Sequence, residues 1–251
     1  MNDIDIIKNY WSSRAEVFSE INREELNTDR LEIWEDLLKD YLNGASLNVL
    51  DAGCGAGFFS VLFSRYGHKV TAIDLSEDML AQAKQNVNAF GNPNNAAFFP
   101  MDAQKLEFPD SSFDLVISRN ITWVLEHPEE AYKEWMRVLK SGGSLINFDA
   151  NYFLYMNDPE EYKNYEAGLQ AVKDNGLELI DWGHGETFDE LISRLPSSHR
   201  KRPAWDVDTL IKLGCGSLYI KPKISGKIHD RYNELYYIEI PTFMICAEKT
   251  E

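Results

Sequence analysis

The sequence is poor in cysteine, and the few cysteines present form no recognisable site. Cys54, Cys215 and Cys246 are the only three in 251 residues. They are odd in number, widely separated, and include no Cys-x-x-Cys pair. Neither a disulfide framework nor a zinc site is therefore indicated, and we expect no bound metal.

Long apolar runs are also missing from the sequence. No stretch approaches the roughly 20 consecutive apolar residues that a membrane-spanning helix needs. The first five residues are acidic rather than patterned like a signal peptide. We expect no membrane partner and a location in the cytoplasm.

Basic residues are outnumbered by acidic ones. The chain has 25 Lys and Arg against 41 Asp and Glu, which gives a formal net charge of −16. A surface of this sign repels phosphate backbones, so we do not expect a nucleic-acid partner. The acidity serves either solubility or the attraction of a cationic substrate, and composition leaves both open, as it leaves open the oligomeric state.

Short apolar segments alternate with helical ones from residue 47 onward. Strands are predicted at 47–50, 69–74, 96–100, 113–118 and 144–148, with helices at 58–66, 77–90 and 128–140. Single helices between short apolar strands indicate parallel pairing with right-handed crossovers. Two later strands, 217–221 and 242–249, are predicted to pair at the sheet edge.

These elements predict an α/β fold. We expect a Rossmann-like doubly wound sheet of about seven strands, mostly parallel with an antiparallel edge pair, plus a helical cap insertion. Apolar residues at helical spacing, among them Trp11, Ala15 and Phe18, predict two helices before residue 45. His68, in the turn after a helix, is expected at the surface. Four parts are predicted: N-terminal helices closing over the site (1–45), the core (46–150), the cap insertion (151–203) and the completion of the sheet (204–251).

A glycine-rich loop follows the first predicted strand and reads Asp51-Ala52-Gly53-Cys54-Gly55-Ala56-Gly57. Glycines let the backbone turn tightly and approach a ligand, and the following helix presents free N–H groups. Asp74 ends the second strand about 20 residues later, where a carboxylate can accept hydrogen bonds from both ribose hydroxyls. Asp102 follows the third strand, where an adenine amino group is expected.

The order of five motifs resembles that of the class I S-adenosylmethionine (SAM)-dependent methyltransferases, and most closely their UbiE-like small-molecule group. Besides the glycine loop these are Asp74-Leu75-Ser76, Asp102-Ala103, Phe113-Asp114-Leu115-Val116 and Arg137-Val138-Leu139-Lys140-Ser141-Gly142-Gly143. The resemblance covers residues 47–150 well and the tail loosely. It implies SAM as cofactor and in-line methyl transfer to a small molecule.

The resemblance also implies which residues contact the cofactor. Around the methionine part and the sulfonium it places Asp51, Gly53, Cys54, Gly55, Arg119 and Asn120. Around the ribose and adenine it places Asp74, Leu75, Met79, Asp102 and Ala103. Tyr10, Trp11 and Arg14 resemble the N-terminal segment that closes over SAM, with Arg14 available to the carboxylate, although core packing is an alternative role for Trp11.

Three other functions are alternatives to methyl transfer. Nicotinamide binders carry G-x-G-x-x-G, whereas this loop has G-x-G-x-G preceded by Asp51, which is unfavourable beside a pyrophosphate and favourable beside the ammonium group of SAM. An aminopropyl transferase would need acidic residues where Arg119 stands. A SAM-binding regulatory protein without turnover remains an alternative.

The methyl acceptor is not identified by the sequence. Aromatic residues that are candidates to line its site are Trp123, Tyr152, Tyr155 and Tyr236. They would either cage a cationic amine or serve only in packing. Arg200 is a candidate either to bind an acidic substrate group or to belong only to a solvated loop. His127 and His184 are candidates for a general base, so nitrogen, oxygen and sulfur acceptors all stay open.

Overall fold

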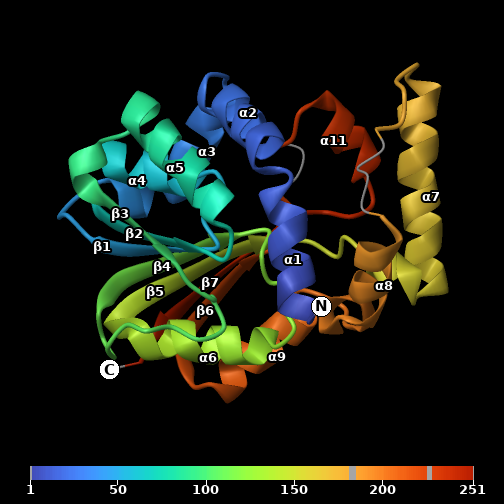
Figure 1. Cartoon of the computed structure of the whole chain (residues 1–251). Coiled ribbons are helices and arrows are strands. Elements are labelled where there is room, and N and C mark those ends of the chain that lie inside the picture. The colour runs from blue at the N-terminus through green and yellow to red at the C-terminus, as the bar shows by residue number, and fades with distance from the viewer. Residues whose placement is uncertain (1, 181–184, 225–227, 251) are drawn as a thin grey trace.

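The computed structural model describes residues 2–180, 185–224 and 228–250, and its strands form one seven-stranded sheet (Figure 1). The strands are β1 (Asn48–Ala52), β2 (Lys69–Asp74), β3 (Ala96–Pro100), β4 (Phe113–Arg119), β5 (Leu139–Asp149), β6 (Cys215–Lys221) and β7 (Phe243–Lys249). Their order across the sheet is β3-β2-β1-β4-β5-β7-β6. The order reverses between β1 and β4, which is where open α/β sheets bind ligands.

Strand direction separates the core of the sheet from its edge. Strands β1 to β5 pair in parallel, whereas β7 is antiparallel to both of its neighbours, β5 and β6. The prediction of a Rossmann-like, mostly parallel sheet with an antiparallel edge pair is therefore confirmed.

Helices cover both faces of the sheet (Figure 1). One face packs against α3 (Arg30–Leu42), α4 (Phe58–Arg65) and α5 (Glu77–Phe90), and the other against α6 (Pro128–Val138) and α9 (Ala204–Lys212). Successive strand side chains point to opposite faces, so Val49 contributes to the first core and Leu50 to the second. Fully buried Trp34 and Trp135 anchor the two cores.

The N-terminal region contains three helices rather than the two predicted. They are α1 (Asp3–Ser12), α2 (Ala15–Leu26) and α3. The spacing of Trp11 and Phe18 suggested one continuous helix, but the chain breaks between them. The Ser13 hydroxyl donates to the Tyr10 carbonyl, and Arg14 leaves helical geometry at φ −110° and ψ 1°. Local side-chain hydrogen bonding of this kind competes with helix continuation.

His68 is buried, which contradicts its predicted surface position. Its Nδ1 accepts a hydrogen bond from the Leu47 backbone N–H at 3.1 Å, and its Nε2 lies 3.1 Å from the Leu42 carbonyl. The ring therefore satisfies backbone groups at the entrance to β1. A histidine in a turn can be buried when both ring nitrogens find such partners.

Two segments far apart in sequence gather beyond α1, on the right of Figure 1. One carries η2 (Leu154–Met156), α7 (Pro159–Asp174), α8 (Glu186–Arg194) and η3 (Pro196–His199), and the other carries α11 (Arg231–Tyr236). A Cβ on Gly168 of α7 would lie 2.1 Å from the Tyr236 carbonyl oxygen, so glycine permits the close approach of α7 and α11.

A remaining short element, η1 (Pro93–Asn95), precedes β3. Among the residues that the structure describes, every helix is too short or too polar to cross a bilayer.

Candidate functional site

Two adjoining cavities lie at the carboxyl end of the parallel strands. They hold about 1020 Å³ and about 1300 Å³ of empty space up to their open mouths. These volumes include space that is open to solvent at the mouths, and the concave, largely apolar linings are of the kind that binds small organic molecules. The first lies over the glycine loop, at the point where the strand order reverses.

The glycine loop forms the floor of the first cavity. Gly53, Gly55 and Gly57 all have positive φ angles, of 68°, 51° and 87°. At Gly55 a Cβ would meet nothing within 4 Å, so the backbone there faces open space. At Gly57 a Cβ would lie 2.9 Å from Ala83 Cβ, so this glycine lets α4 pack closely on α5.

Asp74, at the end of β2, holds this loop in place through hydrogen bonds to the backbone. One carboxylate oxygen accepts from the Gly55 N–H and the other from the Ser76 N–H, each at 2.9 Å. Burial raises the pKa of Asp74 above its ordinary value. Each oxygen keeps acceptor capacity for a further donor.

Asp51, at the end of β1, is the most deeply buried carboxyl in the floor, at 3% exposure. Ser60 donates to it at 2.6 Å. Burial raises the pKa of Asp51 to about 7, while the Ser60 hydrogen bonds oppose the shift and neighbouring Asp74 adds to it. A cation bound beside Asp51 would favour its ionised form.

Apolar side chains form the far end of the first cavity. Leu75, Met79, Met101 and Leu125 line it together with Asp102 and Ala103. Asp102 accepts from the Gln104 N–H at 2.9 Å, which fixes the turn after β3. The arrangement combines apolar walls with one polar edge, which suits a purine base.

The first and second cavities share part of their lining. The shared residues are Trp11, Phe18, Asn22, Arg119 and Asn120. Arg119 lies 4.7 Å from the Phe58 ring centroid, and Asn120 adopts a left-handed φ of 56°. The end of β4 thus forms the wall between the two spaces.

The second cavity is lined mainly by aromatic side chains. The predicted acceptor residues Trp123, Tyr152, Tyr155 and Tyr236 all line it. So do Tyr10 and Arg14, which the structure places here rather than in the first cavity, with the Arg14 guanidinium 4.4 Å from the Tyr10 ring. Of the residues implied to contact the cofactor, the others line the first cavity, including Trp11, Gly53, Cys54 and Leu75.

Comparison with known proteins places the chain in a family. A family described as a methyltransferase domain matches residues 50–147. A malonyl-[acyl-carrier protein] O-methyltransferase from Erwinia pyrifoliae is 42% identical over 45% of this chain and 40% of its own length. The ubiquinone/menaquinone biosynthesis C-methyltransferase UbiE from Roseobacter denitrificans is 30% identical over 72% of this chain and 70% of its own. The chain belongs to the class I SAM-dependent methyltransferases, in their UbiE-like group.

The fold of this methyltransferase also matches solved structures. Haemonchus contortus phosphoethanolamine N-methyltransferase 2, in complex with SAM, superposes with a TM-score of 0.60 at 18% identity. The match covers 89% of this chain and 52% of that protein. At this level of identity the likeness concerns the fold alone.

SAM is the cofactor of the family, and the first cavity fits it chemically. Gly55 opens the loop backbone toward the cavity, and Asp51 is a buried carboxyl of the sign that an ammonium group needs. Family membership favours methyl transfer over the nicotinamide-dependent oxidoreductase and the aminopropyl transferase.

Two of the predicted residues, His127 and Arg200, are not brought into either cavity of the methyltransferase. His127 caps α6, its N–H donating to Gln104, and Arg200 pairs with Glu129 and stacks 4.7 Å from the Trp205 ring. Neither occurs among the described residues that line the two cavities. His184 lies outside the described residues.

Several lining residues carry no sequence motif. Glu25 of α2 forms a two-point ion pair with Arg119 at the shared wall, at 2.9 and 3.2 Å. His229 and Asp230 come from the segment between β6 and β7, in which Tyr236 was predicted to line the acceptor site but these two residues were not. The sequence did not identify Glu25 as a lining residue, because Glu25 lies among other polar helix residues. Its side chain faces inward only because of how α2 packs.

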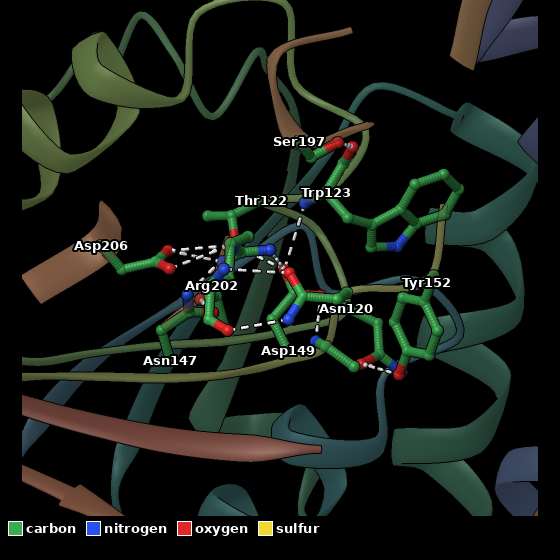
Figure 2. Close-up of polar contacts among 12 residues, drawn as sticks. Asn120, Thr122, Trp123, Asn147, Asp149, Tyr152, Ser197, Arg202 and Asp206 are labelled. Atoms are coloured by element: carbon green, nitrogen blue, oxygen red, sulfur yellow. Dashed lines mark hydrogen bonds and ion pairs between the residues drawn. The ribbon is translucent and has the colours of Figure 1, made fainter. Parts of the chain in front are cut away.

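A buried polar network supports the loop after β4. Figure 2 shows Arg202 between Asp206 and Asp149, and its guanidinium lies 2.6 and 2.9 Å from these carboxylates. Asp149 also accepts from Thr122 and from the Trp123 N–H, so the network fixes the loop that carries Trp123 into the second cavity. Arg202 therefore has a structural role.

Proposed function

We propose that this methyltransferase transfers a methyl group from SAM in the first cavity to a small-molecule acceptor in the second. The observation that carries the proposal is the wall that the cavities share at Trp11, Arg119 and Asn120. In-line displacement needs the attacking atom about 3 Å from the methyl carbon with water excluded. Two adjoining spaces with shared lining residues would bring an acceptor next to a bound SAM.

The residues of the first cavity have distinct proposed roles. Asp51 would pair with the ammonium group, and Asp74 would accept from the ribose hydroxyls while it holds the glycine loop. Asp102 and Ala103 would contact the adenine edge, with Met79 against its face. SAM supplies an already activated methyl group, so the protein needs to position and shield the reacting atoms rather than create a leaving group.

The acceptor is proposed to be a small molecule with a flat apolar portion. Aromatic walls from Trp123, Tyr152 and Tyr236 support this, since such rings stack on planar groups. A net charge of −16 supports the proposal that no nucleic acid binds. The free thiols of Cys54, Cys215 and Cys246 are compatible with the reducing cytoplasm as the site of action.

The cofactor assignment is tested by calorimetric titration of SAM and of S-adenosylhomocysteine. Asp74→Asn should weaken both at least about tenfold, the effect of losing a charge-assisted hydrogen bond. Asp78→Asn, on the exposed first turn of α5, is the matched control and should bind like wild type. Thermal melts of both variants show whether the loop still folds. Failure of well-folded wild type to bind either ligand would remove the basis of the proposal.

Turnover is tested by release of S-adenosylhomocysteine with a panel of amines, phenols and thiols. Transfer to any member supports an enzyme. Tight SAM binding with no transfer to the whole panel would favour the alternative, a SAM-binding regulatory protein.

A further inference from the structure

Helix α2 turns one of its faces toward the second cavity. The residues of α2 that line this cavity are Phe18, Ile21, Asn22 and Glu25. Their spacing of three and four residues places them on one side of the helix. Phe18 and Asn22 also line the first cavity. Asn22 therefore lies where the two cavities adjoin, with Phe18 and Glu25 as its neighbours along this face.

The side chain of Asn22 is buried, yet it has no hydrogen-bond partner among the described residues. It is 6% exposed. Its Oδ1 and Nδ2 take part in none of the hydrogen bonds of that part of the chain, and neither atom is fully shielded. Because Asn22 lines both cavities, the two atoms open into them. A buried carboxamide costs free energy unless its donors and its oxygen are used, so this position points to a ligand.

Charged residues of the second cavity are paired inside the protein. Arg119 forms its two-point ion pair with Glu25 at 2.9 and 3.2 Å. Arg30 lies 3.0 Å from Glu24 and 3.9 Å from Asp230. The charges of these residues thus have counter-charges without a ligand.

Other polar side chains of this cavity contact their neighbours. The Tyr152 hydroxyl donates to Asn120 Oδ1 at 2.9 Å (Figure 2), and the Arg14 guanidinium lies 4.4 Å from the Tyr10 ring centroid. Asn22 differs because both its oxygen and its amide nitrogen are left for a ligand. A carboxamide is neutral and carries N–H donors beside an oxygen that accepts. An uncharged group that both accepts and donates a hydrogen bond, as a hydroxyl does, complements it.

We propose that Asn22 binds the methyl acceptor, and that the acceptor presents an uncharged hydroxyl group to it from a planar apolar frame. This inference rests on the proposed function, which assigns the second cavity to the acceptor. Trp123 and Tyr152 would hold the frame. Nδ2 of Asn22 would donate to the hydroxyl oxygen, and Oδ1 would accept from the hydroxyl. A cationic amine or a carboxylate would lose its hydration there and meet opposite charges that are already paired.

Four probes on one frame test the acceptor class: 2-naphthol, 2-fluoronaphthalene, 2-naphthoate and 2-naphthylmethylammonium. Each is titrated by calorimetry into protein saturated with S-adenosylhomocysteine. Wild type should bind 2-naphthol at least about tenfold more tightly than each of the others. Tighter binding of a charged probe, or no binding of any probe, would overturn the proposal.

The role of Asn22 is tested by Asn22→Leu, which replaces the carboxamide with an apolar group of the same branching. Affinity for 2-naphthol should fall about tenfold, to that of 2-fluoronaphthalene, whose own affinity should change less than about threefold. Asn88→Leu, exposed on α5, is the matched control and should leave both affinities unchanged. Equal losses for the two probes would mean that the side chain only shapes the cavity, and would overturn the proposal.

Thermal unfolding without ligand separates ligand binding from a structural role. Asn22→Leu should unfold at or above the wild-type temperature, because a buried carboxamide without a partner does not stabilise the fold. Unfolding clearly below wild type would show a structural role and overturn the proposal.

Affinity for S-adenosylhomocysteine decides which ligand Asn22 serves. Asn22→Leu should change it less than about threefold. A larger loss for S-adenosylhomocysteine than for 2-naphthol would assign Asn22 to the cofactor and overturn the proposal. Failure of wild type to bind S-adenosylhomocysteine is a different result and counts against the proposed function. The probe titrations, repeated without S-adenosylhomocysteine, would then still decide the role of Asn22.

Discussion

Arg119 and Glu25 are 94 residues apart in sequence, yet their side chains form a two-point ion pair at the wall between the cavities. Their side chains are 21% and 5% exposed. Glu25 also accepts from the Trp34 indole at 2.6 Å. The pair therefore ties α2 to the end of β4 and sets where Arg119 lies relative to both cavities.

Neutralising Glu25 should destabilise the protein. Glu25→Gln keeps the shape but leaves Arg119 without its counter-charge, and we expect a loss of about 2 kcal/mol in the free energy of unfolding. Glu24→Gln, whose partner contact is exposed, should stay within about 0.5 kcal/mol of wild type. Urea denaturation measures both, and equal stability of the two variants would contradict a stabilising role for the buried pair.

Cofactor affinity should depend on pH through Asp51. Its pKa is raised to about 7 without ligand, and the ammonium group of S-adenosylhomocysteine favours the ionised form. Affinity should rise with pH toward pH 7, by up to about tenfold per unit for one proton released, and then level off. Calorimetry from about pH 5.5 to 8 measures this. Asp51→Asn should flatten the profile, whereas Asp78→Asn should not.

In the ligand-free protein the raised pKa of Asp51 acts on stability, which falls as the pH rises, whereas cofactor affinity rises. A folded-state pKa raised from 3.8 to about 7 means that the folded state holds the proton more tightly. Its contribution to stability is complete below about pH 4 and is lost as the pH rises through 7. The upward pKa shift of Asp74 acts in the same direction. Unfolding of Asp51→Asn should therefore vary less over this range than that of wild type.

Gly57 should tolerate alanine less well than Gly67, although both have φ near +88°, at 87° and 88°. At Gly67 a Cβ meets nothing within 4 Å, so only the backbone conformation penalises alanine, by about 1 kcal/mol. At Gly57 the Cβ also presses on Ala83 of α5, which adds about 1–3 kcal/mol. Thermal denaturation of the two variants gives the difference, and its absence would show that α5 shifts freely.

Arg202 should be far more sensitive to lysine substitution than Arg200. Arg202 contacts Asp149 and Asp206 from a side chain 1% exposed, and a single ammonium group cannot reproduce its forked geometry. We expect Arg202→Lys to lose about 3 kcal/mol. Arg200→Lys, at a partly exposed pair with Glu129, should change stability by less than about 0.5 kcal/mol. Comparable denaturation midpoints would contradict the buried network as a stabilising element.

The features that were predicted correctly from the sequence are those that depend on residues close together along the chain. The glycine loop, Asp74 and Asp102 each follow a short apolar strand, and parallel strands bring such residues to one edge of the sheet. The sheet itself was predicted for the same reason, since its strands and helices each carry their own periodicity. These features depend on local pattern and connectivity alone.

Prediction from the sequence failed where a role depends on packing between distant segments. Glu25 and His229 reach the second cavity only because α2 and the segment before β7 fold against the end of β4. His68 was predicted to be an exposed turn residue, but its ring is buried and hydrogen-bonded to backbone groups of Leu42 and Leu47, which precede β1. The helix break at Ser13 depends on one side-chain hydrogen bond that apolar spacing does not reveal.

The side chains common to both cavities imply more than proximity. Trp11 and Phe18 come from the two helices that lie over the carboxyl end of the sheet, and each would contact cofactor and acceptor alike. If one of these side chains moves when SAM binds, the contacts that it can make with the acceptor change as well. Thermodynamic linkage then makes the influence mutual: whatever factor SAM applies to acceptor affinity, the acceptor applies to SAM.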